Sequence, residues 1–233
     1  MYEISMVTKV KELQEAWGLL YQQYLRYNLI DENYYKLWAF PHYFTKLAGT
    51  WVGKKDQVIT STISCVLDKE HLLPLDNYYH NELNQLRLQG ARLTEIGLLT
   101  SKRESSNGNL LAKLQSYPLA FGLLHGFHDF VIGIHPNRVA YYEKVFGFIQ
   151  IGEEKQYIHL NRAPVALLYL SLKESTIFTR TQVNLAIQLA QQEDLPLRNE
   201  ELCAAFHHKF FSEFKSFYYQ YTDQKEMQFS PVY

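Results

Sequence analysis

The chain has 233 residues, 47% of them hydrophobic, which is enough for one well-buried core with a modest appendage. Its formal net charge is −1, and its pI is about 6.8. A chain with this balance lacks the strong positive field that draws proteins onto nucleic acid or anionic lipid. We therefore expect it to act on small molecules and to bind no nucleic acid.

The cysteines and the N-terminal segment indicate in which cellular compartment the protein is expected. Cys65 and Cys203 are far apart and fit neither a disulfide framework nor a metal knuckle, so we expect a reducing environment. Residues 1–11 are not a basic segment followed by an apolar run and a small-residue cleavage site. No uninterrupted apolar segment approaches the ~20 residues that span a bilayer. The sequence thus predicts a cytoplasmic protein without a membrane span.

Hydrophobic periodicity predicts strands and helices along most of the chain. In chain order these are a strand at 2–7, a helix at 10–25, a hairpin at 50–67, a helix within 71–89, a strand at 92–100, a helix at 110–124, a strand at 130–134, a helix at 138–146, strands at 156–159 and 165–171, and helices around 183–190 and 202–217. Thr8 is the expected N-cap of the first helix. Pro118 either kinks the helix at 110–124 or begins a second segment. Residues 28–50, which Pro41 interrupts, fit a loop with one helical turn.

The strand at 92–100 separates its side chains between two faces. Strict alternation places on one face Leu93, Glu95, Gly97 and Leu99, and on the other Thr94, Ile96 and Leu98. A glycine weakens the interior of a strand, so Gly97 indicates a bulge or the close approach of another backbone.

The order of the elements and one helix resemble a known superfamily. The segment Asn137-Arg-Val-Ala140-Tyr-Tyr142-Glu-Lys-Val-Phe-Gly147-Phe148 resembles the signature helix of the GCN5-related N-acyltransferases, in which an Asn, an Ala and a Tyr precede Glu-Lys and Gly-Phe. Further landmarks narrow the resemblance; they are Leu73-Pro74-Leu75-Asp76, Glu95-Ile96, His135-Pro136 and Ala163-Pro164-Val165-Ala166-Leu167-Leu168. Together they resemble the catalytic domain of bacterial long-chain N-acyl amino acid synthases, relatives of the acyl-homoserine-lactone synthases.

This resemblance implies a fold and a domain organisation. Residues 1–172 are expected to form an α/β acyltransferase domain, with a mixed, mostly antiparallel central sheet flanked by helices. Residues 173–233 are expected to form a helical C-terminal extension. The aromatic stripe at 206–217 would pack this extension onto the core or form a lid over an acyl chain.

The resemblance also implies an activity. Family members transfer a long-chain acyl group from acyl carrier protein to the amine of an amino acid or a similar small molecule. No tightly bound cofactor is expected, because the acyl-phosphopantetheine donor, on carrier protein or on coenzyme A, is a co-substrate. Two alternatives stay open, namely an acetyl-coenzyme A-dependent N-acetyltransferase and a non-catalytic acyl or lipid sensor on the same fold.

Glu95 and Tyr142 are the candidate catalytic residues. An amine that attacks a thioester must lose a proton, and the departing thiolate must gain one. The resemblance aligns Glu95 with the family's strand-four glutamate as the base, and burial would raise its pKa toward the working range. Tyr142 matches the helix tyrosine near the leaving sulfur, as the acid. The structural alternatives are a Glu95 paired with Arg92 or Arg138 or set at a strand edge, and a Tyr142 that is a core aromatic beside Tyr141.

Other residues are candidates for binding the acyl donor. In this superfamily a backbone N–H of strand four polarises the thioester carbonyl where that strand splays from strand five. The matching residues here are Leu98, Leu99 and Thr100. His135, at the end of the next strand, and Arg138, on the signature helix, are further candidates because open sheets bind ligands at such strand ends.

Two departures from the family pattern affect the donor and the activity. The loop at 101–108 lacks the glycine-rich motif that cradles the pyrophosphate of coenzyme A, which favours acyl carrier protein as donor. Lys102 and Arg103 could contact such an acidic partner, although loop residues of this kind are more often only solvated. Relatives have an arginine three residues after the strand-four glutamate, where this sequence has Leu98. The substitution implies a different substrate contact, or a protein that binds without catalysing.

No metal site is predicted. His125, His128, His207 and His208 are not accompanied by a third ligand at a fitting spacing. Nothing in the sequence orients a histidine toward Cys65 to form a nucleophilic pair.

Overall fold

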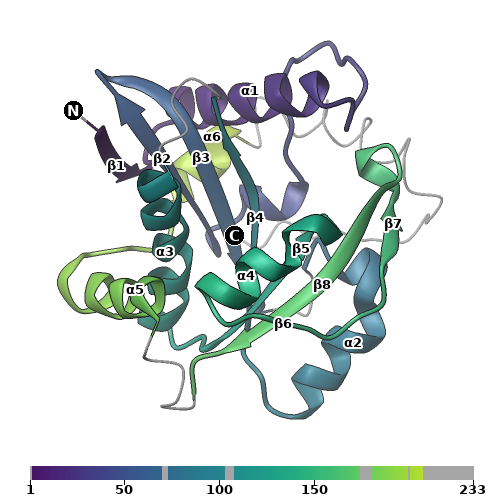
Figure 1. The fold of residues 1–233 in the computed structure, drawn as a ribbon. Helices are drawn as coiled ribbons and strands as arrows, with labels where there is room; N and C mark the ends of the chain where they lie inside the picture. The colour runs from purple at the N-terminus through teal and green to yellow at the C-terminus, as the bar shows by residue number, and fades with distance from the viewer. Residues whose placement is uncertain (1, 70–72, 103–107, 174–179, 199, 207–233) are drawn as a thin grey trace.

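The computed structural model describes residues 2–69, 73–102, 108–173, 180–198 and 200–206. The strands are β1 (Tyr2–Met6), β2 (Ala48–Lys55), β3 (Val58–Leu67), β4 (Leu93–Ser101), β5 (Asp129–Ile134), β6 (Ile149–Gln150), β7 (Lys155–Tyr157) and β8 (Ala163–Ser171). The helices are α1 (Val10–Arg26), α2 (Asp76–Leu88), α3 (Gly108–Leu124), α4 (Val139–Val145), α5 (Thr181–Gln192) and α6 (Glu200–Phe206). Short 3₁₀ turns in the described residues are η1 (Pro41–Phe44), η3 (Pro136–Arg138) and η4 (Ile158–Leu160). Figure 1 shows the arrangement of these elements.

The eight strands form a sheet with the order β1-β2-β3-β4-β5-β8-β6, and β7 pairs with β8. All neighbouring strands are antiparallel except β4 and β5, which are parallel. A parallel pair needs a crossover connection, and α3 supplies it. The prediction of a mixed, mostly antiparallel sheet flanked by helices is confirmed.

Helices cover both faces of the sheet. Side chains of α1, α2 and η1 pack in one cluster with residues of β4, β5 and β8. On the other face, α3, α4 and α5 contribute to two further clusters, and α3 and α5 lie side by side (Figure 1). Within β5, Val131 packs on the α1 side, and Phe130 and Ile132 pack on the opposite side. Both faces of β5 are covered, which explains why its sequence is a continuous apolar run.

Helix α1 forms where the three-and-four spacing of apolar residues predicted it. Its buried residues include Leu13, Trp17 and Leu20, which face the core. The predicted N-cap was wrong. The N-cap is Lys9, in an extended conformation, and no side chain caps the first turn.

Several boundaries differ from the prediction. Pro118 lies inside one continuous α3. The strand expected at 156–159 ends at Tyr157, since the chain enters η4 and then turns through Asn161 and Arg162, which have φ values of 47° and 59°. The two-residue strand β6 was not predicted. Of the aromatic helix expected at 202–217, the structure describes only the part in α6, and the stripe beyond Phe206 lies outside the described residues.

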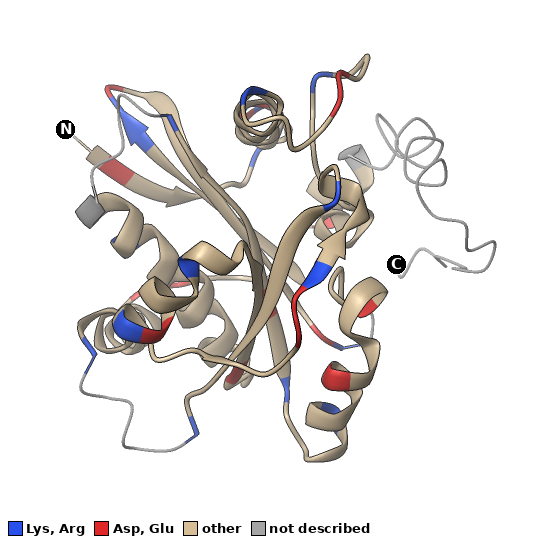
Figure 2. Ribbon diagram, turned by 45° about the vertical axis from the view of Figure 1, so that its right-hand side comes forward, with Lys and Arg blue, Asp and Glu red and all other residues tan. Residues whose placement is uncertain are grey.

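Charged residues are distributed over many elements of the fold, as Figure 2 shows. This distribution agrees with the small net charge of −1. In the described parts of the chain, no helix is long and apolar enough to cross a membrane.

Candidate active site

Strands β4 and β5 are paired over only part of their length. The pairing joins Leu93–Ile96 to Asp129–Ile132. Strand β4 then continues beside β3, and β5 continues beside β8. Among the described residues, no pair joins β4 to β5 after these four. The carboxyl ends of the two parallel strands therefore separate, at the edge where open sheets of this kind bind ligands.

A bulge follows Gly97 in β4. The register between β3 and β4 shifts between Thr62 and Ser64, and Leu98 has a φ of 53°. A bulge inserts one extra residue and re-aims the side chains after it. The bulge that Gly97 indicated in the sequence is therefore present.

The strict alternation predicted for this strand is wrong beyond the bulge. Leu98 packs with Leu93 in the cluster under α1, and Leu99 packs against the cluster under α3. Leu98 thus lies on the same face as Glu95, and Leu99 lies on the other. The inserted residue is the physical reason, because it reverses the two-residue period from that point onward.

Glu95 is buried on the α1 face of the sheet, with 4% of its surface exposed. Burial raises the pKa of its carboxyl group well above the ordinary value. The backbone N–H of Leu75 opposes that shift by donating to Oε2 at 2.8 Å. Neither of the two proposed arginine partners pairs with this carboxylate, because the Arg92 guanidinium lies over the Phe127 ring at 4.5 Å and Arg138 is exposed.

A buried ion network fixes the segment that donates to Glu95. Arg87 donates to Asp68 at 2.7 Å and to both oxygens of Asp76 at 2.7 Å. Asp76 also accepts the N–H of Leu73 at 2.7 Å. These bonds hold the residues that precede α2, so that the N–H of Leu75 faces the carboxyl group. Asp76 and Asp68 raise the pKa of Glu95, and Arg87 lowers it.

Tyr142, the candidate acid, projects from α4. Its ring is half-buried, stacks on Phe146 at 5.8 Å and meets Phe148 edge-on at 5.9 Å. Burial and then the neighbouring Tyr141 raise the pKa of its hydroxyl, so the group stays protonated at neutral pH. A proton is therefore available on Tyr142 for a leaving group, although its aromatic contacts also fit the core alternative.

Two tyrosines that the sequence analysis did not single out, Tyr43 and Tyr24, lie near these candidates. Tyr43 of η1 lies against β4, since a Cβ built on Gly97 would be 2.6 Å from its hydroxyl oxygen. The pKa of Tyr43 is raised by burial first and then by Glu95. Tyr24 of α1 raises the pKa of both Tyr43 and Tyr142 through its proximity. The close approach expected at Gly97 is thus made by a side chain rather than by another backbone.

The predicted donor-binding residues lie at the carboxyl ends of β4 and β5. Leu99 and Thr100 are partly exposed along the end of β4, and the N–H of Lys102 donates to the Thr60 carbonyl at 2.8 Å. His135 follows β5, where its Nδ1 accepts the N–H of Asn137 at 3.3 Å. Arg138 lies at the end of the adjoining η3, whereas Arg103 lies outside the described residues. The structure thus places the described candidates near the strand divergence, and their roles stay predictions.

The remaining candidates in the sequence are the histidines and Cys65. The described residues contain no group of three or more His, Cys, Asp or Glu side chains that could hold a metal ion. His125 contacts the Leu195 carbonyl at 2.9 Å. Burial raises the pKa of the Cys65 thiol to about 12, which keeps it protonated and poorly nucleophilic.

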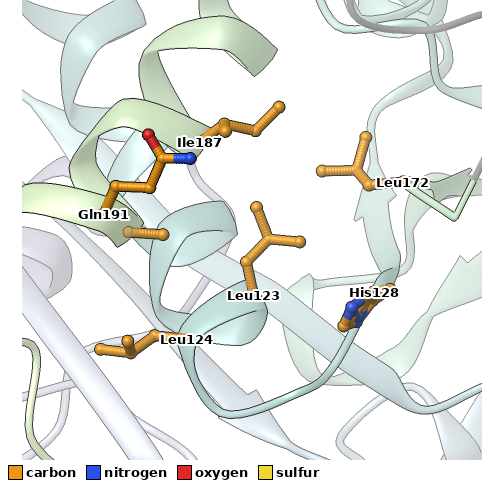
Figure 3. A pocket seen from close by; sticks show the side chains of 7 residues that line it. Leu123, Leu124, His128, Leu172, Ile187 and Gln191 are labelled. Atoms are coloured by element: carbon orange, nitrogen blue, oxygen red, sulfur yellow. The ribbon is translucent and has the colours of Figure 1, made fainter. Parts of the chain in front are cut away.

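A separate apolar groove of about 420 Å³ lies at the other end of β5. Figure 3 shows the side chains that line it, from α3, α5 and the ends of β5 and β8; they are Leu123, Leu124, His128, Leu172, Ile187, Ala190 and Gln191. None of the predicted site residues that the structure describes lines this groove. It therefore adds nothing to the site around Glu95.

The sequence and the fold match known acyltransferases. The family model of the N-acyl amino acid synthase FeeM matches residues 15–171, more than half of the chain. The solved structure of FeeM, an N-acyl amino acid synthase from uncultured soil microbes, is 25% identical, with a TM-score of 0.66 over 83% of this chain and 99% of that chain. No curated protein matches the sequence.

More distant structures share the fold alone. The CoA-dependent acyl-homoserine lactone synthase BjaI, with SAM and isopentyl-CoA, is 10% identical, with a TM-score of 0.60 over 88% of this chain and 99% of that chain. An acyl-CoA N-acyltransferase from Pseudomonas aeruginosa is 11% identical, with a TM-score of 0.52 over 73% of this chain and 100% of that chain. The family match and the shared fold support an acyltransferase. The chain belongs to the FeeM family of N-acyl amino acid synthases.

Proposed function

We propose that this protein transfers a long-chain acyl group from acyl carrier protein to the amine of an amino acid or a similar small molecule. The observation that carries the proposal is the carboxyl group of Glu95, which is buried on β4 next to the point where β4 and β5 separate. A carboxyl group in that setting has the raised pKa that suits a general base near neutral pH.

The reaction needs two proton transfers. The amine nitrogen attacks the thioester carbonyl carbon, a C–N bond forms, and the C–S bond breaks. Glu95 accepts the proton that the nitrogen loses. Tyr142 donates its hydroxyl proton to the departing sulfur and is reprotonated from solvent, so that the products are an N-acyl amine and the free phosphopantetheine thiol.

Acyl carrier protein is the preferred donor because the loop at 101–108 lacks the glycine-rich motif that would cradle a pyrophosphate. A carrier protein presents a single phosphodiester and an acidic surface, for which Lys102 and Arg103 are the basic candidates. Coenzyme A is the alternative donor. A direct comparison of acyl carrier protein and coenzyme A carrying the same acyl chain decides between them.

The test is an acylation assay in vitro, with products identified by mass spectrometry. We expect the wild-type chain to form N-acyl amino acids from acyl carrier protein, and Glu95→Gln to lower kcat/KM about 10²–10⁴-fold. The matched control is Glu82→Gln, which removes a carboxylate on α2 that pairs with Lys155 at 2.9 Å and should leave the rate unchanged. Tight donor binding without any product, identical in wild type and Glu95→Gln, would indicate a sensor instead of an enzyme.

A further inference from the structure

The hydroxyl group of Tyr43 lies beside the candidate base. Gly97 is two residues after Glu95, so both face the α1 side of β4. A Cβ on Gly97 would be 2.6 Å from the Tyr43 hydroxyl oxygen and 3.8 Å from its Cζ. The glycine therefore leaves room for this phenol, and the influence of Glu95 on the pKa of Tyr43 reflects the same proximity.

The Glu95 carboxyl group and the Tyr43 hydroxyl each keep hydrogen-bonding capacity that contacts among the described residues do not use. Glu95 uses Oε2 to accept the N–H of Leu75, and in the described parts of the chain no hydrogen bond reaches its Oε1 or the Tyr43 hydroxyl. Other buried tyrosines differ, because the Tyr79 hydroxyl is 2.9 Å from the Glu153 carbonyl and 2.7 Å from the Val165 carbonyl. A polar atom that the fold leaves with an open hydrogen-bonding position fits a role toward a ligand.

Tyr43 is held firmly in its position. The buried guanidinium of Arg198 donates to the Tyr43 carbonyl and, at 2.9 Å, to the Thr50 hydroxyl. The next residue, Phe44, packs edge-on against Trp17 at 5.0 Å. A catalytic hydroxyl needs such support, because a loosely held group loses much of its effect.

We propose that Tyr43 is a third catalytic group, which binds the acceptor amine beside Glu95 and selects a primary amine. This inference rests on the proposed acyl transfer. A neutral primary amine has two N–H bonds and one lone pair. One N–H is directed to Glu95, the other donates to the Tyr43 hydroxyl oxygen, and the lone pair is left to attack the thioester carbon.

The proton balance of the transfer is unchanged. Glu95 takes the proton that the nitrogen loses, and Tyr43 keeps its own proton, which it donates in a hydrogen bond toward the Glu95 carboxylate. A secondary amine has a single N–H bond. It can satisfy Glu95 or Tyr43 but not both, so one buried polar group loses its partner.

The experiment uses the full chain with a saturating acyl donor. The substrates are the proteinogenic amino acid with the fastest acylation and its N-methyl derivative. We expect wild type to favour the primary amine by about 10- to 100-fold in kcat/KM. Tyr43→Phe should lose most of this preference and raise KM for the amine while KM for the donor stays constant. The control Tyr117→Phe removes a hydroxyl on the opposite face, which contacts Glu193 at 3.3 Å, and should keep the preference.

A second measurement separates this inference from the proposed function. The pKa of Glu95, followed by NMR of a ¹³C-labelled carboxyl group, should rise in Tyr43→Phe because the ionised form loses a nearby hydroxyl dipole that can turn toward it. It should not change in Tyr117→Phe. Acylation of the N-methyl derivative by wild type as fast as the primary amine, or an unchanged Glu95 pKa in Tyr43→Phe, would overturn the role of Tyr43. Absence of all acylation would instead overturn the proposed function and leave the NMR result to decide the contact.

Discussion

The contact between Gly97 and Tyr43 predicts the effect of a single methyl group. In Gly97→Ala the new Cβ would lie 2.6 Å from the Tyr43 hydroxyl oxygen, where real Cβ atoms are essentially never found. Tyr43 is only 1% exposed, and its backbone carbonyl is held by Arg198. The ring therefore cannot move aside without disturbing its neighbours, and the site should lose both stability and activity.

The magnitude follows from the same geometry. Forcing a methyl group into a packed interior costs about 1–3 kcal/mol, and the constrained ring leads us to expect ~2 kcal/mol. In the Tyr43→Phe background the clashing oxygen is absent, and the nearest remaining atom of the ring is 3.8 Å away, an ordinary contact. There Gly97→Ala should be neutral, or stabilising by up to ~1 kcal/mol because alanine restricts the unfolded chain.

Urea denaturation of wild type, the two single variants and the double variant gives the coupling free energy. Gly18→Ala is the control, since Gly18 lies within α1 and a Cβ there would be 3.7 Å from its nearest neighbour, Leu37. This substitution should be neutral or stabilise the helix by up to ~1 kcal/mol. An equal cost of Gly97→Ala with and without the Tyr43 hydroxyl would refute the contact on which the argument depends.

Three further predictions concern buried charges. Because the folded pKa of Glu95 is raised, its stabilising contribution is present below the unfolded value near 4.5 and is lost as pH rises through the folded value. Urea denaturation should therefore show Glu95→Gln gaining stability over wild type as pH rises above the unfolded value. Arg87→Met leaves Asp68 and Asp76 without their shared cation. It should destabilise the fold by about 3–5 kcal/mol and, as Arg87 lowers the pKa of Glu95, move the acidic limb of the kcat/KM profile to higher pH. The pKa of Asp129 is lowered, because Lys173, Tyr169 and Ser171 outweigh its burial. In thermal unfolding, Asp129→Asn should cost about 2–4 kcal/mol near neutral pH, and the deficit should shrink as pH falls below the unfolded value near 3.8.

Much of the fold could be predicted because its elements have strong local periodicity. The apolar stripe of α1 and the continuous apolar run of β5 each indicate both the element and its buried faces. The region at 28–50 has no such period, since it combines a loop, the short turn η1 and the start of β2. Tyr43 lies in this region, so nothing local in the sequence connects it with β4.

The site was predicted in part for a related reason. Glu95 and Tyr142 came from a family resemblance, and the residues that surround them come from distant parts of the chain. The donor to Glu95 is Leu75, and the support of Tyr43 is Arg198. Such contacts depend on tertiary packing across a long sequence separation, which a pattern along one segment does not contain. Gly97 was the available signal, but it indicated a close approach without indicating the partner.

The bulge after Gly97 gives the apolar side chain of Leu98 a direct electrostatic effect on Glu95. With strict alternation, the residue three positions after Glu95 would lie on the opposite face, and its charge would matter little. The bulge instead brings Leu98 onto the face of Glu95, where it is 6% exposed. An arginine at this position would favour the ionised carboxylate, as opposite charges do. Leucine supplies no such charge, so ionisation of Glu95 depends on the N–H of Leu75, on Arg87 and, under our inference, on the Tyr43 hydroxyl. The apolar residue therefore keeps the pKa of the candidate base high, which suits the proposed proton transfer from an amine better than a strongly stabilised carboxylate would.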